Sequence, residues 1–414
     1  MAETVAPLVV VGAGAAGLMT AIQAGRAGVR GVVALDGARK LGAKILVAGG
    51  GRCNVTHHAV HERDYAGAAS HLIRRVLNRF PVDRCIAFFD ELGVELKREE
   101  TGKLFPVTDD ARTVLEALLR AARDAGVELR HPQRVLAVEP AEAGFLVRTD
   151  AGDVRARRLV MATGGKALPK SGSDGAGLEM VVRLGHTLTP RVIPALVPLL
   201  LADGHWLREL SGLALPAELR VVAGSGKRLA RTQGSLLCTH FGLSGPVALD
   251  VSRHLAMHQV ADPSVRLQVA LLPDLDEALA DRWLLDATGR SLLSRLRERL
   301  PERMARATLA AAGLDTETTA QRAPKERRRD LVRHLVALDL PVTGDRGFTY
   351  AETTAGGVPL TELDLDTMES RVRPGLHLVG EMLDVDGRIG GFNFQWAWAG
   401  GFVAGTAAAV ALET

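Results

Sequence analysis

Apolar and small residues at the start of the chain follow the order expected for a strand, a helix and a second strand. Residues 8–11 form a short valine-rich run, which is typical of a strand buried in a parallel sheet. Residues 18–27 predict a helix whose small side chains face that sheet, and residues 32–35 form a second apolar run that ends at Asp36. The pattern predicts that the chain begins with an α/β unit.

Three glycines, Gly12, Gly14 and Gly17, separate the first strand from the helix in the spacing GxGxxG. The first permits a tight turn, the second lets the backbone approach a pyrophosphate, and the third lets the helix pack on the strand. Free amides and the positive end of the helix dipole then face the phosphates. Asp36 follows Gly17 by about 20 residues, where an acid accepts hydrogen bonds from a ribose diol. The motif therefore predicts dinucleotide binding.

A second strand-to-helix pattern, near the C-terminus, favours a flavin dinucleotide. Residues 376–379 predict a strand that ends at Glu381, Asp384 and Asp386 follow in a loop, and a helix is predicted at 393–409. An acid in this segment can hold ribityl hydroxyls. The amides at the helix start can stabilise negative charge on the N1/O2 edge of a reduced flavin. The two ends of the chain together predict FAD.

A run of three glycines at residues 49–51, within KILVAGGGRCNVT, follows the second strand closely enough to pass the middle of the cofactor. Glycine leaves no side chain there and adopts positive φ at low cost. We expect Lys44 and Arg52 to balance phosphate charge and Asn54 to hydrogen-bond a polar edge of the flavin. Cys53 has no resolving cysteine nearby in the sequence, so we interpret it as a small packing residue beside the flavin.

A fourth glycine-rich segment, at residues 159–177, contains a strand that runs into ATGG and suits another close backbone approach. The four segments together supply the expected cofactor-binding residues. These are Gly12, Gly14, Ala15, Ala16, Gly17, Asp36, Gly37, Lys44, Gly49, Gly50, Gly51, Arg52, Cys53, Asn54, Thr163, Gly164, Gly165, Gly380, Glu381, Asp384, Asp386, Gly390, Gly391 and Asn393.

The hydrophobic pattern changes in the middle of the chain. Alternating strands and helices give way to short strands, and then to helices in which leucine and valine recur at i, i+3 and i+4. We therefore predict that one domain is inserted in another. The cofactor-binding domain comprises residues 1–190 and 346–414, and the inserted domain comprises 191–345, with strands at about 191–274, a return near 339–345 and helices at about 275–338.

The charge of the chain gives no reason to expect a polyanionic partner. Its 51 Lys and Arg residues nearly balance 48 Asp and Glu residues, which leaves a formal charge of +3. The densest basic run, residues 325–334, has apolar residues at helical spacing, and we interpret it as the solvent face of a helix. No surface of interleaved arginine and aromatic residues is apparent in the sequence. We therefore expect no nucleic-acid partner.

Cysteine content and hydropathy predict a cytoplasmic protein. The three cysteines, Cys53, Cys85 and Cys238, form no CxxC pair, and their odd number argues against a disulfide framework. No signal peptide is visible. The longest apolar stretches, such as residues 192–201, contain prolines and are too short to span a bilayer, so no membrane partner is expected. The oligomeric state is not predicted.

Histidines are the remaining candidates for chemistry. His57, His58 and His61 lie close together, but no cysteine or carboxylate set at ligand spacing accompanies them, so no metal site is expected. His240 lies in THFGLSGP, after a predicted strand of the inserted domain. One interpretation is a turn at the end of a strand. The other is a lid that brings His240, the candidate catalytic residue, to the flavin for proton transfer near neutral pH.

Seven motifs together resemble the bacterial aminoacetone-oxidase-like flavoproteins, a family that includes bile-acid dehydro-reductase-like proteins. In chain order they are GAGAAG, KILVAGGGRCNVT, GKLFPVTDDA, MATGG, THFGLSGP, TTAGGV and GEMLDVDGRIGGFNFQWAWAGG, from Val9 to about Gly405. The resemblance implies noncovalent FAD and an α/β fold, in which a glutathione-reductase-like, Rossmann-like domain carries an inserted β-barrel and helical domain. Asp36 stands where the family has Glu. Arg388 and Ile389 stand where a smaller or aromatic neighbour is expected, which affects the substrate pocket.

These observations favour an FAD-dependent oxidoreductase that acts on an unidentified small molecule by hydride transfer through flavin N5. An oxidase and an NAD(P)H-fed reductase both remain open. No second GxGxxG domain is visible, so NAD(P)H as a reductant is expected to bind only transiently. The alternatives are a flavin-holding scaffold and an FAD-dependent RNA-modifying protein.

Overall fold

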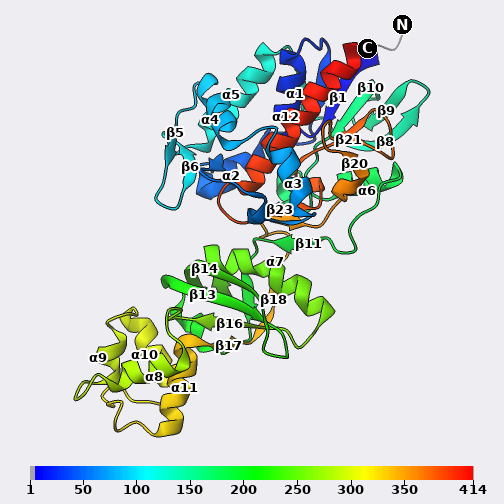
Figure 1. Ribbon diagram of the computed structural model, residues 1–414. Coiled ribbons are helices and arrows are strands. Elements are labelled where there is room, and N and C mark those ends of the chain that lie inside the picture. The colour runs from blue at the N-terminus through cyan, green and yellow to red at the C-terminus, as the bar shows by residue number, and fades with distance from the viewer. Residues whose placement is uncertain (1–4, 414) are drawn as a thin grey trace. The chain divides into compact units, whose positions relative to one another are not determined.

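The computed structural model describes residues 5–413, which form two compact units (Figure 1). Within these residues the first unit combines both ends of the chain, 5–194 and 352–413, and the second unit comprises 195–351. The sequence pattern placed the two boundaries slightly earlier, after residues 190 and 345. All four glycine-rich segments belong to the first unit.

A mixed sheet with parallel strands at its middle forms the centre of the first unit. Its strands include β1 (Val5–Val11), β2 (Val32–Leu35), β10 (Val154–Met161) and β22 (Leu376–Leu378), with β7 (Glu128–Arg130) at one edge. β1 pairs in parallel with β2 and β10, and β10 pairs in parallel with β22. The two apolar runs predicted as the first two strands are buried in this sheet, which confirms both predictions.

The first and last helices of the chain pack closely against each other. α12 (Phe392–Glu413) runs along α1 (Ala15–Arg26) beside the sheet (Figure 1). A Cβ atom at Gly401 would lie 2.6 Å from a backbone oxygen of α1, and one at Gly405 would lie 2.4 Å from another. The glycines therefore allow the C-terminal helix to approach the N-terminal one, and this brings both ends of the chain to the same site.

The other elements of the first unit surround this centre. They are α2 (Ala43–Gly51), β3 (Thr56–His57), β4 (Tyr65–Gly67), α3 (Ser70–Leu77), α4 (Val82–Glu91), β5 (Leu96–Arg98), β6 (Lys103–Pro106), α5 (Ala111–Asp124), β8 (Val135–Ala141), β9 (Gly144–Thr149), α6 (Ala176–Arg183), β19 (Thr353–Ala355), β20 (Leu363–Asp364), β21 (Glu369–Ser370), the 3₁₀ turn η5 (Gly380–Met382) and β23 (Val385–Gly387). β20 and β21 extend the central sheet beyond β22, and the β8–β9 hairpin joins it at β10.

A seven-stranded antiparallel sheet organises the second unit, in the order β17-β16-β13-β14-β15-β12-β18. Its end strands, β17 and β18, are consecutive in the chain and only Pro341 separates them. The elements of this unit are β12 (Leu199–Leu201), β13 (Ala214–Val222), β14 (Arg228–Thr239), β15 (Gly242–Ser244), α7 (Pro246–Ala261), β16 (Arg266–Ala270), α8 (Glu277–Leu285), α9 (Leu292–Leu296), α10 (Glu302–Ala311), α11 (Lys325–Val336), β17 (Leu338–Leu340) and β18 (Val342–Asp345).

The helices of the second unit agree in part with the sequence pattern. α10 and α11 confirm two predicted helices, whereas α9 occupies only the middle of the third prediction, residues 290–300. α7 packs on β13 and β14 and was not predicted (Figure 1), because apolar and polar residues are mixed around it and give little amphipathic signal. In α11 the apolar residues are buried and most of the basic ones are exposed, as expected of a solvent-facing helix.

Candidate cofactor site

The turn between β1 and α1 leaves room for a ligand at one glycine and none at two others. A Cβ atom at Gly12, where φ is +98°, would lie 2.5 Å from a backbone oxygen just after β10, and one at Gly17 would lie 1.8 Å from the Gly12 oxygen. A Cβ atom at Gly14 would meet nothing within 4 Å. Gly14 is the N-cap of α1 and provides no side-chain cap for the helix that begins with Ala15 and Ala16. A pyrophosphate fits this arrangement.

Asp36, at the end of β2, hydrogen-bonds the backbone of the glycine turn and the backbone that follows β2. Its Oδ2 accepts a hydrogen bond of 2.8 Å from the Ala13 amide, and its Oδ1 accepts one of 2.8 Å from the Ala38 amide. The first bond joins the acid to the glycine turn. Each carboxylate oxygen keeps a further lone pair that a ribose hydroxyl can use. Gly37 is exposed, and a Cβ there would lie 3.1 Å from the Arg134 Cβ.

The triple-glycine segment begins as helix α2 and then leaves helical geometry. ψ is 143° at Ala48, and φ is +58°, +70° and +86° at Gly49, Gly50 and Gly51. The residues before Ala48 therefore form a helical turn, and the glycines depart from it. A Cβ at Gly49 would lie 2.8 Å from the Phe105 ring, but one at Gly50 would meet nothing within 4 Å. Protein packing requires Gly49, whereas Gly50 borders open space.

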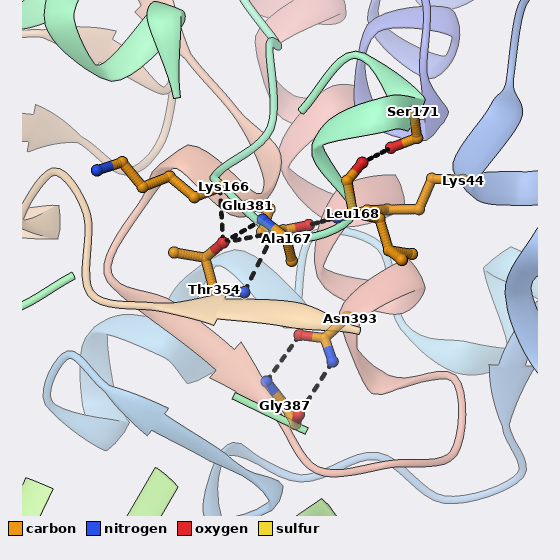
Figure 2. Close-up of polar contacts among 9 residues, drawn as sticks. All are labelled: Lys44, Lys166, Ala167, Leu168, Ser171, Thr354, Glu381, Gly387 and Asn393. Carbon is orange, nitrogen blue, oxygen red and sulfur yellow. Dashed lines mark hydrogen bonds and ion pairs between the residues drawn. The ribbon is translucent and has the colours of Figure 1, made fainter. Parts of the chain in front are cut away.

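A polar network joins three of the glycine-rich segments (Figure 2). Lys44 of α2 forms an ion pair with Oε2 of Glu381 in η5. Oε1 of Glu381 accepts hydrogen bonds from the Thr354 amide at 3.1 Å and the Thr354 hydroxyl at 2.9 Å. The Thr354 oxygen in turn accepts bonds from the amides of Lys166 at 2.8 Å and Ala167 at 3.1 Å. The segment after β10, strand β19, η5 and α2 are thus held together through Thr354 and Glu381.

The network gives Lys44 and Glu381 partners that differ from the expected ones. Lys44 was expected to balance phosphate charge and Glu381 to contact the cofactor, but the two half-buried side chains neutralise each other. Thr354 was absent from the expected residues, although the motif TTAGGV that contains it had carried part of the family resemblance. Nothing in the local sequence indicates that its hydroxyl accepts two backbone amides from a segment nearly 190 residues earlier.

Arg52 also lies among protein partners. Its Nη1 is 2.6 Å from Glu99 Oε1 and 3.5 Å from Asp109 Oδ1, and its guanidinium lies 4.0 Å from the centre of the Phe105 ring. The hydrogen bond with Glu99 raises the pKa of Arg52 above its ordinary value. The expected role in balancing phosphate charge therefore competes with two carboxylates that already hold this side chain.

Cys53 and Asn54 follow the glycines into the interior. Cys53 is fully buried with φ of +57°, and burial raises the pKa of its thiol to about 12. The thiol is therefore protonated at neutral pH and is not a nucleophile. Asn54 is 7% exposed, and its Oδ1 is buried without a hydrogen-bond partner among the described residues. A lone buried acceptor costs about 1–3 kcal/mol, so this oxygen suits an N–H group of a ligand.

The glycines of ATGG make room for protein atoms. A Cβ at Gly164, where φ is +73°, would lie 2.7 Å from the Ser173 hydroxyl, and one at Gly165 would lie 2.4 Å from the Thr354 hydroxyl. Their close backbone approach is therefore to other chain segments. The hydroxyls of Thr163 and Ser173 are both buried without a partner in the part of the chain that the structure describes. Like the Asn54 oxygen, they are available to a polar ligand.

The C-terminal segment turns sharply between β22 and β23. Gly380 has φ of +78°, and a Cβ there would lie 3.0 Å from the Ala16 side chain. Asp384 is half-buried and lies just before β23. Asp386 was expected in a loop, but it is 2% exposed and lies within β23, opposite Ala66 of β4. All three residues of β23 are buried beside β4, so Asp386 lies inside the unit, which the acid-rich local sequence does not indicate.

The start of α12 is held by an asparagine and two glycines. Oδ1 of Asn393 accepts a bond of 2.8 Å from the Gly387 amide, and its Nδ2 donates one of 2.9 Å to the Gly387 oxygen (Figure 2). Gly390 and Gly391 have φ of +128° and +93°, and a Cβ at Gly391 would lie 2.6 Å from the backbone of Thr56. Asn393 therefore positions the helix start against β23, with its amide group already engaged.

The histidines have different surroundings. His57 is buried, its ring stacks on Phe392 at 4.9 Å, and its nitrogens lie 2.8 Å and 3.1 Å from the oxygens of Ala59 and Thr101. Burial lowers the pKa of His57. Among the described residues no group of three His, Cys, Asp or Glu side chains is arranged to hold a metal ion. Residues 5–413 also include no helix that is both long and apolar enough to cross a membrane.

His240 belongs to the second unit, whereas the glycine-rich segments belong to the first. It lies at the turn between β14 and β15, its side chain is exposed, and its ring meets Phe241 edge-on at 5.1 Å. Its backbone oxygen accepts a bond of 2.9 Å from Arg208. The prediction of a turn at the end of a strand is confirmed, and a role in proton transfer stays a prediction.

Comparison with known proteins shows the family. The model of the HI0933-like protein Rossmann domain matches residues 6–407. The chain belongs to the HI0933-like family. It is 34% identical over 408 residues to the 3-dehydro-bile acid delta(4,6)-reductase of Clostridium scindens, covering 97% of this chain and 98% of that protein. It is 32% identical over 394 residues to the ribosomal RNA dihydrouridine synthase of Escherichia coli, covering 94% of this chain and 95% of that protein.

Solved structures show the same fold at low sequence identity. The 3-ketosteroid delta1-dehydrogenase of Sterolibacterium denitrificans superposes with a TM-score of 0.50 at 15% identity, covering 98% of this chain and 99% of that one. The FrdA chain of E. coli quinol fumarate reductase gives a TM-score of 0.51 at 16% identity, covering 100% of this chain and 71% of that one. This HI0933-like protein is an FAD-dependent oxidoreductase with a Rossmann-like fold, as the resemblance implied.

Proposed function

We propose that the protein uses noncovalently bound FAD to reduce a carbon–carbon double bond that is conjugated to a carbonyl group. The observation that carries the proposal is the chemistry shared by the two similar enzymes, which match over nearly their whole length. The name 3-dehydro-bile acid delta(4,6)-reductase indicates action on double bonds that are conjugated to a 3-oxo group. A dihydrouridine synthase makes the product of hydrogen addition across C5 and C6 of uracil, which are conjugated to the C4 carbonyl.

The residues present fit FAD in this role. We assign the pyrophosphate to the open space at Gly14 and the first amides of α1, and the adenosine ribose to Asp36. The open space at Gly50 and the free acceptor of Asn54 suit the flavin, whose ring system offers an N–H donor. Bound FAD supplies the hydride through its N5 atom.

The state of the cysteines supports a noncovalent cofactor and a cytoplasmic location. All three cysteines are free and buried. A covalent link through Cys53 would need an exposed, reactive sulfur, whereas its thiol is buried and protonated. Free cysteines are also the ordinary state in a reducing compartment. We propose that NAD(P)H serves as a transient reductant, since the sequence holds no second dinucleotide motif.

The substrate is the open part of the proposal. A small molecule, the class expected from the sequence, is supported by the relative that acts on a bile acid. RNA is supported by two relatives named ribosomal RNA dihydrouridine synthase, at 32% identity in E. coli and 29% in Haemophilus influenzae. Both candidates require the same chemistry, so one experiment on the holoenzyme can compare them.

The test has two parts. Heat denaturation should release free FAD, not FMN, from the yellow holoenzyme. Anaerobic photoreduction, followed by mixing with one acceptor at a time, should then give faster reoxidation by a 3-oxo-4,6-diene steroid or by uridine-containing RNA than by oxygen. Saturated analogues of each acceptor serve as controls, because they lack the double bond. Reoxidation by oxygen alone would contradict the proposal.

A further inference from the structure

The sheet of the second unit brings two distant segments to the same end. Leu200 of β12 pairs with Gly242 of β15 on one side and with Gly344 of β18 on the other. β15 begins at Gly242 and β18 ends at Asp345, so the residues just before one strand and just after the other lie at the same level of the sheet. These residues, about 100 positions apart in the chain, form a group of two rings and one charge, in which Tyr350 is exposed and Phe241 and Arg346 are half-buried.

An arginine contacts two aromatic rings in this group. The guanidinium carbon of Arg346 is 4.4 Å from the centre of the Phe241 ring and 3.4 Å from that of the Tyr350 ring. We call Phe241, Arg346 and Tyr350 the arginine stack. The Arg346 amide also donates a bond of 3.1 Å to the Pro198 oxygen, which holds the segment beside the sheet. The stack is therefore attached to the sheet beside the start of β12.

The charge of Arg346 is not neutralised. Among the described residues no carboxylate lies within ion-pair distance of its guanidinium, whereas two other arginines that lie over rings each hold one. Arg295 over Trp283 pairs with Glu298 at 2.7 Å, and Arg388 over Phe392 pairs with Asp64 at 2.9 Å. Because the guanidinium contacts two rings and holds no carboxylate, its N–H groups are left to bind an anionic ligand.

The exposed surface of the stack suits a planar ring that is attached to an anion. Tyr350 is 48% exposed, so Arg346 covers part of its ring and the rest faces solvent. A base can stack on that ring, and the N–H edge of Arg346 can bind a phosphate. A steroid would instead need an apolar wall, which an uncompensated guanidinium does not provide.

We propose that the arginine stack binds single-stranded RNA, with a base on Tyr350 and a phosphate at Arg346. The proposal rests on the proposed function and names its substrate class, a uracil nucleotide within RNA. The sequence argued against a nucleic-acid partner partly because no arginine–aromatic surface was apparent. The structure contains such a surface, formed by residues too far apart in the chain to be read as a motif.

Equilibrium binding of a fluorescent oligouridylate to the oxidised holoenzyme tests the proposal without turnover. Tyr350→Ala should weaken binding by roughly 5- to 150-fold, the usual loss of one base–aromatic stack, and Tyr350→Phe should retain it. Arg346→Gln should reduce the slope of log affinity against log salt by about 0.7, the value for one phosphate contact on a single strand. Arg299→Gln is the matched control, an exposed arginine near Trp283 that is already paired with Asp274.

Several outcomes would overturn the proposal. They are a wild-type protein that does not bind the oligouridylate, binding that neither variant changes, and displacement of the RNA by NADPH in a manner that depends on Tyr350. The last outcome would assign the stack to the reductant. Reoxidation of the reduced flavin by a free enone is measured in parallel, so a failure of the stack is distinguished from a failure of the proposed chemistry. FAD content and thermal unfolding of each variant report correct folding.

Discussion

At the end of β2, Asp36 uses both carboxylate oxygens to hold backbone amides, one of them in the glycine turn. Its replacement should therefore affect the ligand and the turn together. We expect Asp36→Ala to weaken FAD binding tens-fold, because a hydrogen bond to a charged group contributes about 1.5–3 kcal/mol. Titration of the apoprotein with FAD measures this loss. Asp36→Asn keeps one acceptor and should lose less FAD affinity. An unchanged dissociation constant in Asp36→Ala would show that Asp36 does not bind the ribose.

At Gly50 φ is positive and the adjacent space is open. A new side chain there would therefore both strain the backbone and enter that space. Gly50→Val should abolish FAD binding, and Gly50→Ala should weaken it strongly, because the new atoms enter the space assigned to the cofactor. Both substitutions also strain the backbone at φ of +70°, by roughly 1–2 kcal/mol. Gly28→Ala is the matched control, since Gly28 has φ of +96° and its Cβ would also meet nothing within 4 Å. Equal FAD retention in Gly50→Ala and Gly28→Ala would show that strain alone acts at Gly50.

Burial of the Cys53 thiol predicts how its reactivity toward alkylation depends on pH. Since burial raises its pKa to about 12, the protonated form persists from neutral pH to well above pH 9, and the native protein should resist alkylation at Cys53 over that range. Cys53→Ser should retain FAD and turn over to within a few-fold, with a lower melting temperature because a hydroxyl is buried. Mass spectrometry after alkylation and steady-state rates test both statements. Loss of turnover with FAD still bound would mean that the protein uses thiol chemistry.

Among the elements, η5, β19, α2 and the segment after β10 meet at Thr354 and Glu381 rather than at a single motif. Thr354→Val keeps the volume and removes the oxygen that accepts the amides of Lys166 and Ala167. Each amide left without a partner costs about 1–3 kcal/mol, so both stability and FAD affinity should fall. Thermal unfolding with and without FAD measures the change. Thr354→Ser keeps the oxygen and should behave like the wild type, and a Thr354→Val variant of unchanged stability would mean that water replaces the hydroxyl.

The C-terminal helix shows why element packing decides the site. α12 approaches α1 through glycines that leave no room for a side chain, and Asn393 fixes its first turn against β23. The amides at its start are therefore presented by a helix that is held at several points along its length. A substitution at Gly401 would act on the site from a distance, because it would move this helix away from α1.

At the scale of the whole molecule, the chain holds one GxGxxG turn and two compact units. No second dinucleotide motif accompanies the first, so reduction of the flavin by NADH and by NADPH should be slow and nearly equal in rate. Anaerobic stopped-flow reduction at several concentrations of each nucleotide measures this. Saturation by one nucleotide at low concentration, with a clear preference over the other, would contradict the prediction and indicate a dedicated binding site.

The sequence by itself determined the features that depend on neighbours along the chain. The first strand, the glycine turn, the first helix and the acid at Asp36 form one local unit, so their spacing predicts both their structure and the class of ligand. The positive φ values of Gly49 and Gly50 also follow from local composition, because few other residues adopt them at low cost. The family resemblance rested on such local motifs and therefore covered nearly the whole chain.

Only the tertiary structure decided which residues face a ligand and which face the protein. Gly50 borders open space while Gly49 and Gly165 pack on protein atoms, although all three look alike in the sequence. Lys44 and Glu381 meet across more than 300 residues, and Arg346 meets Phe241 across about 100. Hydrophobic periodicity reports neighbours within a turn or a strand, whereas these contacts depend on how strands from distant parts of the chain pair in one sheet and close distant segments around one site.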